Sequence, residues 1–158
     1  MKKIFFITSL EIILLSFLFF NCQAQQTTNA SLEEAKKAIA ASNEMLFRAF
    51  AKGDSSIFIA RYAKDCWIMP PNAPALCGPD APGEFFKLGY NKFGVRNGKF
   101  ISIDVFGDGV GFVTEVGFWQ LFDADNKLID NGKFLTLWKK TPDGWKMFRD
   151  SFSSDRNK

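Results

Sequence analysis

Four long stretches rich in aromatic and β-branched residues fill the second half of the sequence and constrain the fold more than any other feature. Gly-, Asp- and Pro-containing segments at residues 107–109, 123–126 and 142–144 separate these stretches, and segments of this kind favour tight turns between antiparallel strands. The pattern predicts strands near residues 99–106, 110–122, 128–140 and 145–153. Since helical spacing is confined to the first half, we predict one α+β domain with helices first and an antiparallel meander last.

Helix signals precede the strands. Ser31 and Glu34 form a capping box that predicts the start of a helix. Gly53 predicts its end, and Asp54 or Ser55 can cap a short second helix. A Pro-interrupted strand is expected near residues 65–70, returning at 75–77, and a third helix follows Gly78. The first helix carries apolar residues on one face at Leu32, Ala35, Ile39, Leu46, Ala49 and Phe50.

The first 24 residues have the order of an export signal. Two lysines precede an apolar run over residues 4–20, and small or polar residues follow. Two cleavage sites compete, one after Ala24 and one before Cys22, which would then carry a lipid. A retained membrane anchor is the alternative, although Glu11 lies within the apolar run. We therefore expect an exported protein, whether periplasmic, secreted or an envelope-anchored lipoprotein, with its membrane contact limited to the signal or the lipid.

These signals divide the chain into four parts. We expect the signal over residues 1–24, a polar tether over 25–30, the folded domain over 31–155 and a short tail over 156–158.

The composition excludes several classes of function. The 158 residues contain no His, which removes imidazole-based catalysis and metal sites that need imidazole ligands. A net charge of +3 from 20 basic and 17 acidic residues is too weak and dispersed to follow a phosphate backbone. We predict no metal, no cofactor and no nucleic-acid partner.

Two glycines within the long strands predict a strongly curved sheet. Gly117 and Gly132 permit sharp bends, and a bent sheet roofed by helices encloses a cone with an apolar interior in which a ligand could lie. Residues 134–138 are apolar on both alternating faces, so the outer face of the sheet also needs cover. A homodimer through the sheet is the simplest cover.

Cys66 and Cys77 flank the Pro-rich bend after the first predicted strand. In an oxidising compartment they could form a disulfide across a hairpin. Two buried free thiols are the alternative.

Several segments together resemble the nuclear transport factor 2-like superfamily, a cone-shaped α+β fold. They read Tyr-Ala-Lys-Asp-Cys at residues 62–66, Gly-Lys-Phe-Leu-Thr-Leu-Trp-Lys-Lys at 132–140, Asp-Gly-Trp-Lys-Met-Phe-Arg-Asp at 143–150 and Ser-Asp at 154–155. The ending is similar to a large, mostly uncharacterised bacterial subfamily whose relatives include ketosteroid isomerase and polyketide cyclases. The resemblance implies a homodimer and a pocket between sheet and helices, but the superfamily hosts many functions.

The steroid isomerase chemistry itself is not expected. By the resemblance, the base aspartate of those enzymes falls on Pro70, which cannot abstract a proton. The first predicted helix also lacks a matching Tyr.

Glu115 is the sharpest remaining candidate for chemistry. Apolar neighbours would raise its pKa, and strand alternation places it on one face with Gly117 and Trp119. On the last strand, alternation groups Arg149 with Trp145. If that face is the inner one, Glu115 and Arg149 could form a structural ion pair, or serve as catalytic base and oxyanion-stabilising cation.

The leading interpretation is an exported binding domain for a small, largely apolar molecule. The alternative is a cofactor-independent lyase or isomerase with Glu115 or Asp130 as general base, and a third is an interaction domain at an envelope surface. The residues do not decide whether the protein is an enzyme. The residues predicted to contact the ligand are Tyr62, Trp67, Trp119, Phe134 and Trp138.

Overall fold

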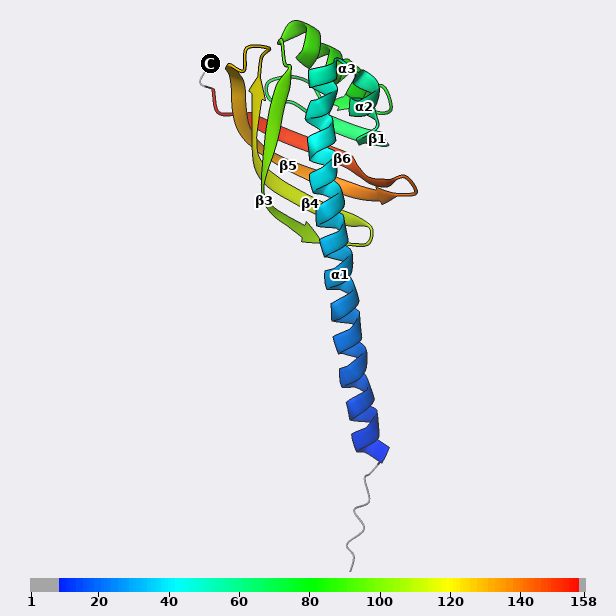
Figure 1. Cartoon of the computed structure of the whole chain (residues 1–158). Helices are drawn as coiled ribbons and strands as arrows, with labels where there is room; N and C mark the ends of the chain where they lie inside the picture. Colours follow the sequence, from blue (N-terminus) through cyan, green and yellow to red (C-terminus); the bar gives the residue numbers. More distant parts are fainter. Residues whose placement is uncertain (1–8, 157–158) are drawn as a thin grey trace, which may run out of the picture.

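The computed structural model describes the backbone of residues 9–156 and the side chains of residues 30–156. Three helices, a single π-helical turn and six strands follow one another along this part of the chain (Figure 1). The helical elements are α1 (Ser9–Lys52), α2 (Ser55–Ile59), α3 (Ala81–Lys87) and η1 (Leu88–Lys92). The strands are β1 (Tyr62–Met69), β2 (Leu76–Cys77), β3 (Asn97–Gly107), β4 (Phe112–Phe122), β5 (Leu128–Thr141) and β6 (Gly144–Ser154).

All six strands form one twisted sheet in the order β2-β1-β6-β5-β4-β3. The meander β3–β6 is antiparallel throughout, which confirms the predicted α+β architecture. The sequence predicted a wholly antiparallel sheet. The observed sheet is mixed, because β1 pairs with β6 in parallel. Strands β2 and β3 form the two edges.

The helices and the inner face of the sheet share one aromatic core. Phe50 of α1 lies 5.4 Å from Phe58 of α2 and 4.8 Å from Phe86 of α3 between ring centroids. Asp54 caps α2 by accepting a hydrogen bond from the backbone N–H of Ser56 at 2.9 Å, as the sequence predicts. Trp138 of β5 is fully buried in this core. These aromatic contacts hold the helices against the sheet.

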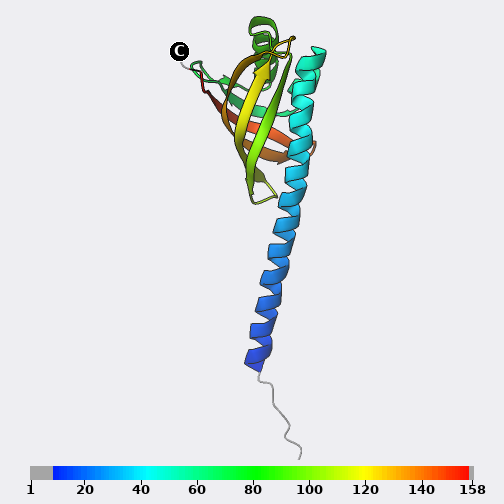
Figure 2. The same cartoon turned by 60° about the vertical axis from the view of Figure 1, so that its left-hand side comes forward.

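Helix α1 is longer than predicted. It begins at Ser9, so Ser31 does not start a helix and the proposed tether at residues 25–30 lies within α1. The first part of α1 extends beyond the sheet, while its last turns run beside β3 (Figures 1 and 2). No helix in the described part of the chain is long and apolar enough to span a membrane. Residues 1–8, 157 and 158 and the side chain of Cys22 lie outside the description, so the export signal and lipidation stay predictions.

One β-bulge in β6 decides which residues of this strand face the core. Met147 pairs with Trp138 and Arg149 pairs with the preceding residue of β5, so Phe148 is the extra residue. Beyond the bulge the alternation is inverted, so that Asp150 is buried and Arg149 lies on the outer face. The predicted grouping of Arg149 with Trp145 is therefore wrong.

Candidate functional site

An open groove lies between α1 and the edge strand β3. Its volume is about 720 Å³, and a second hollow of about 300 Å³ continues along the same seam, sharing Ala40 and Ser102 with the first. A groove of this size is in the range of ligand sites for small molecules. The larger part is lined by Ala40, Asn43, Glu44, Phe47, Arg48, Ala51, Asn97, Gly98, Lys99, Phe100 and Ser102.

Two phenylalanines form the apolar part of the groove. The rings of Phe47 on α1 and Phe100 on β3 are tilted, with centroids 5.0 Å apart. Phe100 also lies 4.8 Å from Phe134, which connects the groove to the core. The helix approaches β3 closely at Gly98, where a Cβ atom would collide with the Phe47 ring and the carbonyl oxygen of Gln120. Glycine at this position therefore sets the width of the seam.

Asn43 and Ser102 line the groove and both donate hydrogen bonds to Glu115. The Nδ2 atom of Asn43 lies 2.7 Å from Oε1 of Glu115, and the Ser102 hydroxyl donates to the same oxygen. The indole N–H of Trp138 donates to Oε2 at 3.0 Å. Glu115 itself is only 1% exposed. Burial raises the pKa of Glu115 above its ordinary value, although the three donors act in the opposite direction.

A second buried carboxylate, Asp150, lies on the same face of the sheet. Tyr62 donates to its Oδ2 atom at 2.8 Å, and Thr136 donates to Oδ1 at 3.0 Å. Thr136 is the strand partner of both Glu115 and Asp150, so the three side chains form a polar row across β4, β5 and β6. Burial raises the pKa of Asp150, and the negative charge of Glu115 raises it further. Tyr62, predicted to contact ligand, is thus fixed to Asp150.

Arg149 does not reach Glu115, so the predicted ion pair is wrong. Its guanidinium lies on the outer face, 3.6 Å from the ring centroid of Phe148 and 5.2 Å from that of Trp67. It donates to the carbonyl oxygens of Asp65 and Phe148 at 3.1 and 2.8 Å. Trp67 is 45% exposed beside it. Trp67 therefore lies outside the cone, against the prediction that it contacts a ligand there.

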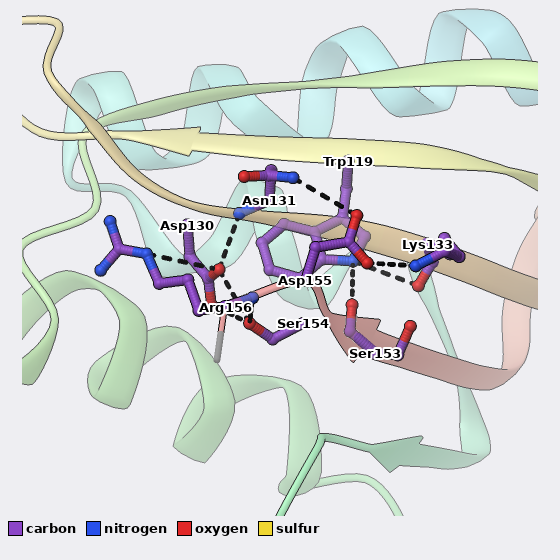
Figure 3. Close-up of polar contacts among 8 residues, drawn as sticks. All are labelled: Trp119, Asp130, Asn131, Lys133, Ser153, Ser154, Asp155 and Arg156. Carbon is purple, nitrogen blue, oxygen red and sulfur yellow. Dashed lines mark hydrogen bonds and ion pairs between the residues drawn. The ribbon is translucent and has the colours of Figure 1, made fainter. Parts of the chain in front are cut away.

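The other predicted ligand contacts fill the inside of the sheet. Trp138, Trp119 and Phe134 are all buried, and none of them lines the groove. The indole N–H of Trp119 is shared between the carbonyl oxygens of Lys133 and Ser153, at 3.2 and 3.1 Å (Figure 3). These side chains belong to the buried inner face of the sheet and do not form the walls of the groove.

Asp130 belongs to a separate cluster at the end of the sheet (Figure 3). Ser154 donates to both of its carboxylate oxygens at 2.9 and 3.0 Å, and the backbone N–H of Asn131 donates at 2.8 Å. The Nε atom of Arg156 lies 3.7 Å away. Asp130 is not part of the groove lining, so its contacts indicate a role in fastening the C-terminal residues to β5.

The predicted disulfide between Cys66 and Cys77 is also wrong, because both thiols are free. Cys77 pairs with Trp67, so it points to the outer face while Cys66 is buried. The Cys66 thiol donates to the carbonyl oxygen of Gly78 at 3.5 Å, and burial raises its pKa to about 11. Because Cys77 pairs with Trp67 and not with the preceding residue Cys66, the two cysteine side chains lie on opposite faces of the sheet.

Sequence patterns did not single out the groove. Asn43 lies on the apolar stripe of α1, four residues after Ile39, and is buried there. A polar residue at a core-facing helix position is the signal that could have identified the site. Ser102 gave no such signal, because its role depends on how β3 pairs with β4.

Solved structures identify the fold. An NTF-2 like protein of unknown function from Shewanella oneidensis has a TM-score of 0.64 and 21% identity, covering 75% of this chain and 98% of that one. A ketosteroid isomerase-like protein from Erwinia carotovora atroseptica has a TM-score of 0.60 and 20% identity, covering 77% and 96%. A nuclear transport factor 2-like superfamily protein from Salmonella enterica has a TM-score of 0.62 and 13% identity, covering 79% and 94%.

The chain has the nuclear transport factor 2-like fold. The resemblance seen in the sequence is confirmed at this level. No family model and no curated protein matches the chain. Because the nuclear transport factor 2-like fold hosts unrelated functions, the groove and its chemistry must carry any functional argument. Within the described residues, no group of three Cys, Asp or Glu side chains could hold a metal ion.

Proposed function

We propose that this chain is a small-molecule-binding domain whose ligand lies in the groove between α1 and β3. The observation that carries the proposal is the groove itself, about 720 Å³ in volume, with two Phe rings and two polar side chains above a buried carboxylate. Ligand sites typically combine apolar walls with a few fixed polar groups.

Binding is favoured over catalysis by the state of Glu115. Its two oxygens already accept three hydrogen bonds, and its side chain is 1% exposed. A substrate could reach this carboxylate only by displacing Ser102 or Asn43. Binding in the groove needs no such movement.

A groove-filling variant tests the binding proposal. Ala40 lines both parts of the groove and is exposed, whereas Ala41 is exposed on α1 but is not part of the lining. We expect Ala40→Trp to weaken binding of the neutral fluorescent probe N-phenyl-1-naphthylamine at least about tenfold, while Ala41→Trp leaves it unchanged. Equal titration curves for the two variants would contradict the proposal.

A lyase or isomerase is the second candidate, with Glu115 as general base. It is supported by the raised pKa of a carboxyl group directly behind the groove and by the similarity to a ketosteroid isomerase-like protein. Exchange of the α-protons of tetralone in deuterated water, followed by NMR, separates the candidates. Exchange accelerated by the wild type and lost in Glu115→Gln would favour the enzyme, and no acceleration would favour binding.

We also propose that two chains pair through the outer face of the sheet. Ile101, Phe118 and Leu135 are each more than two-fifths exposed there. Ile101 pairs with Phe118, and Leu135 lies on the next strand, so the three side chains are neighbours across β3, β4 and β5. Apolar neighbours of this kind are typical of interfaces. In sedimentation velocity, Leu135→Lys should convert a dimer to a monomer, and a monomeric wild type would contradict the proposal.

Export remains our proposal for the location of the protein, on the basis of residues 1–24. Mass spectrometry of protein from its own host would identify the new N-terminus. Cleavage before Cys22 with an added lipid mass, or cleavage after Ala24, would support export. An intact N-terminus in the soluble fraction would contradict it.

A further inference from the structure

Two polar side chains of the groove, Asn43 and Ser102, are held in one orientation by Glu115. A carboxylate only accepts hydrogen bonds, so the amide of Asn43 must turn its Nδ2 atom toward Oε1 of Glu115. The Ser102 hydroxyl also commits its single hydrogen to that oxygen. The Ser102 donor and one of the two N–H donors of Asn43 are therefore used, while Oδ1 of Asn43 and the Ser102 oxygen keep the capacity to accept.

One of these acceptors is unsatisfied. Asn43 is 8% exposed, and its Oδ1 atom has no hydrogen-bond partner in the part of the chain that the structure describes. A buried polar atom without a partner is costly, so a ligand that supplies the missing donor gains that contact. Ser102 keeps its oxygen lone pairs beside it.

From this arrangement we infer that the groove selects ligands that donate a hydrogen bond, namely a neutral hydroxyl group on an aromatic or alicyclic body. The inference rests on the proposed binding function. The aromatic body would lie against Phe47 and Phe100. Arg48 and Lys99 carry positive charges at the groove, balanced by Glu44 and the carboxylate beneath, which favours a neutral ligand over an ion.

Glu115→Gln should abolish this selection for a defined chemical reason. The indole N–H of Trp138 can only donate, so the amide oxygen of the new Gln must face Trp138. Its Nε2 atom then takes the place of Oε1 and donates toward Asn43, which must turn its own oxygen inward. The Asn43 amide group then presents donors to the groove, and a hydroxyl ligand loses its acceptor.

Naphthol and methoxynaphthalene form a matched pair of probes, because methylation removes only the hydrogen that the ligand donates. We expect the wild type to bind naphthol about tenfold more tightly than the ether, as measured by competition with the neutral fluorescent probe N-phenyl-1-naphthylamine. Glu115→Gln should reduce this ratio to about one. Ser102→Ala should reduce the affinity ratio partly. Because Ser102 is exposed, this variant still tests the inference if Glu115→Gln fails to fold.

The outcomes separate the inference from the proposed function. Equal affinity for the two probes in the wild type, with both lost in Ala40→Trp, would overturn donor selection and leave the binding site standing. A ratio that persists in both Glu115→Gln and Ser102→Ala, with each variant folded by circular dichroism, would also overturn it. If neither probe nor the fluorescent dye enters the groove, both the inference and the binding proposal fall.

Discussion

Removing the hydroxyl group of Tyr62 should destabilise the protein in a pH-dependent manner. The Tyr62 hydroxyl donates one of the two hydrogen bonds that Asp150 receives within a fully buried environment. Tyr62→Phe keeps the ring in the core but leaves one carboxylate oxygen unpaired. A buried acceptor left without its partner costs about 1–3 kcal/mol, so we expect a loss of about 2 kcal/mol in the free energy of unfolding at neutral pH.

The sign of the pH dependence follows from the direction of the pKa shift. Burial raises the pKa of Asp150 in the folded state, while the hydrogen bond from Tyr62 lowers it. For a carboxyl group with a raised folded pKa, the associated stability is fully present below the unfolded pKa and is lost as pH rises through the folded pKa. Loss of the Tyr62 hydroxyl raises that pKa further, so wild type and variant should converge at acidic pH and diverge as pH rises.

Urea denaturation followed by tryptophan fluorescence at about pH 5 and about pH 8 would measure this difference. Tyr90→Phe is the matched control, because Tyr90 is the only other tyrosine and its side chain packs on Phe86 and Arg96. We expect that control to change stability by less than about 0.5 kcal/mol at both pH values. A Tyr62→Phe effect that is small, or the same at both pH values, would refute the role assigned to Asp150.

Three further predictions concern the core and the seam. Trp138→Phe should lower the free energy of unfolding by about 2 kcal/mol or more, because it leaves Oε2 of Glu115 without its donor and creates a void. Urea denaturation would measure this loss, and an unchanged free energy would contradict the burial of Trp138 against Glu115. Alkylation of native protein with iodoacetamide, mapped by mass spectrometry, should label Cys77 and spare Cys66, whose pKa is about 11; equal labelling would contradict the pairing of β1 with β2. Gly98→Ala should lower the free energy of unfolding by about 1–3 kcal/mol, because the added methyl group collides with its neighbours between α1 and β3. Thermal denaturation would measure the loss, and an unchanged melting temperature would show that α1 and β3 are further apart.

Local patterns in the sequence determined the order and type of most elements. The turn segments placed the four meander strands within a few residues of their observed bounds, because Gly, Asp and Pro at turns and alternating side chains along strands act over short distances. Alternation also placed Glu115, Gly117 and Trp119 together on the buried face of β4. No bulge interrupts β4 between these residues, so counting by two along the strand holds there.

Only the tertiary structure decided what the polar residues do. The single extra residue Phe148 in β6 turned Arg149 outward and Asp150 inward, and nothing in the local sequence distinguishes a bulge from a regular strand. The partners of Glu115 come from α1, β3 and β5, residues far apart in the chain that meet because the helix packs on the edge strand. The groove is a product of that packing, and so its chemistry depends on the relative placement of elements that local propensity does not encode.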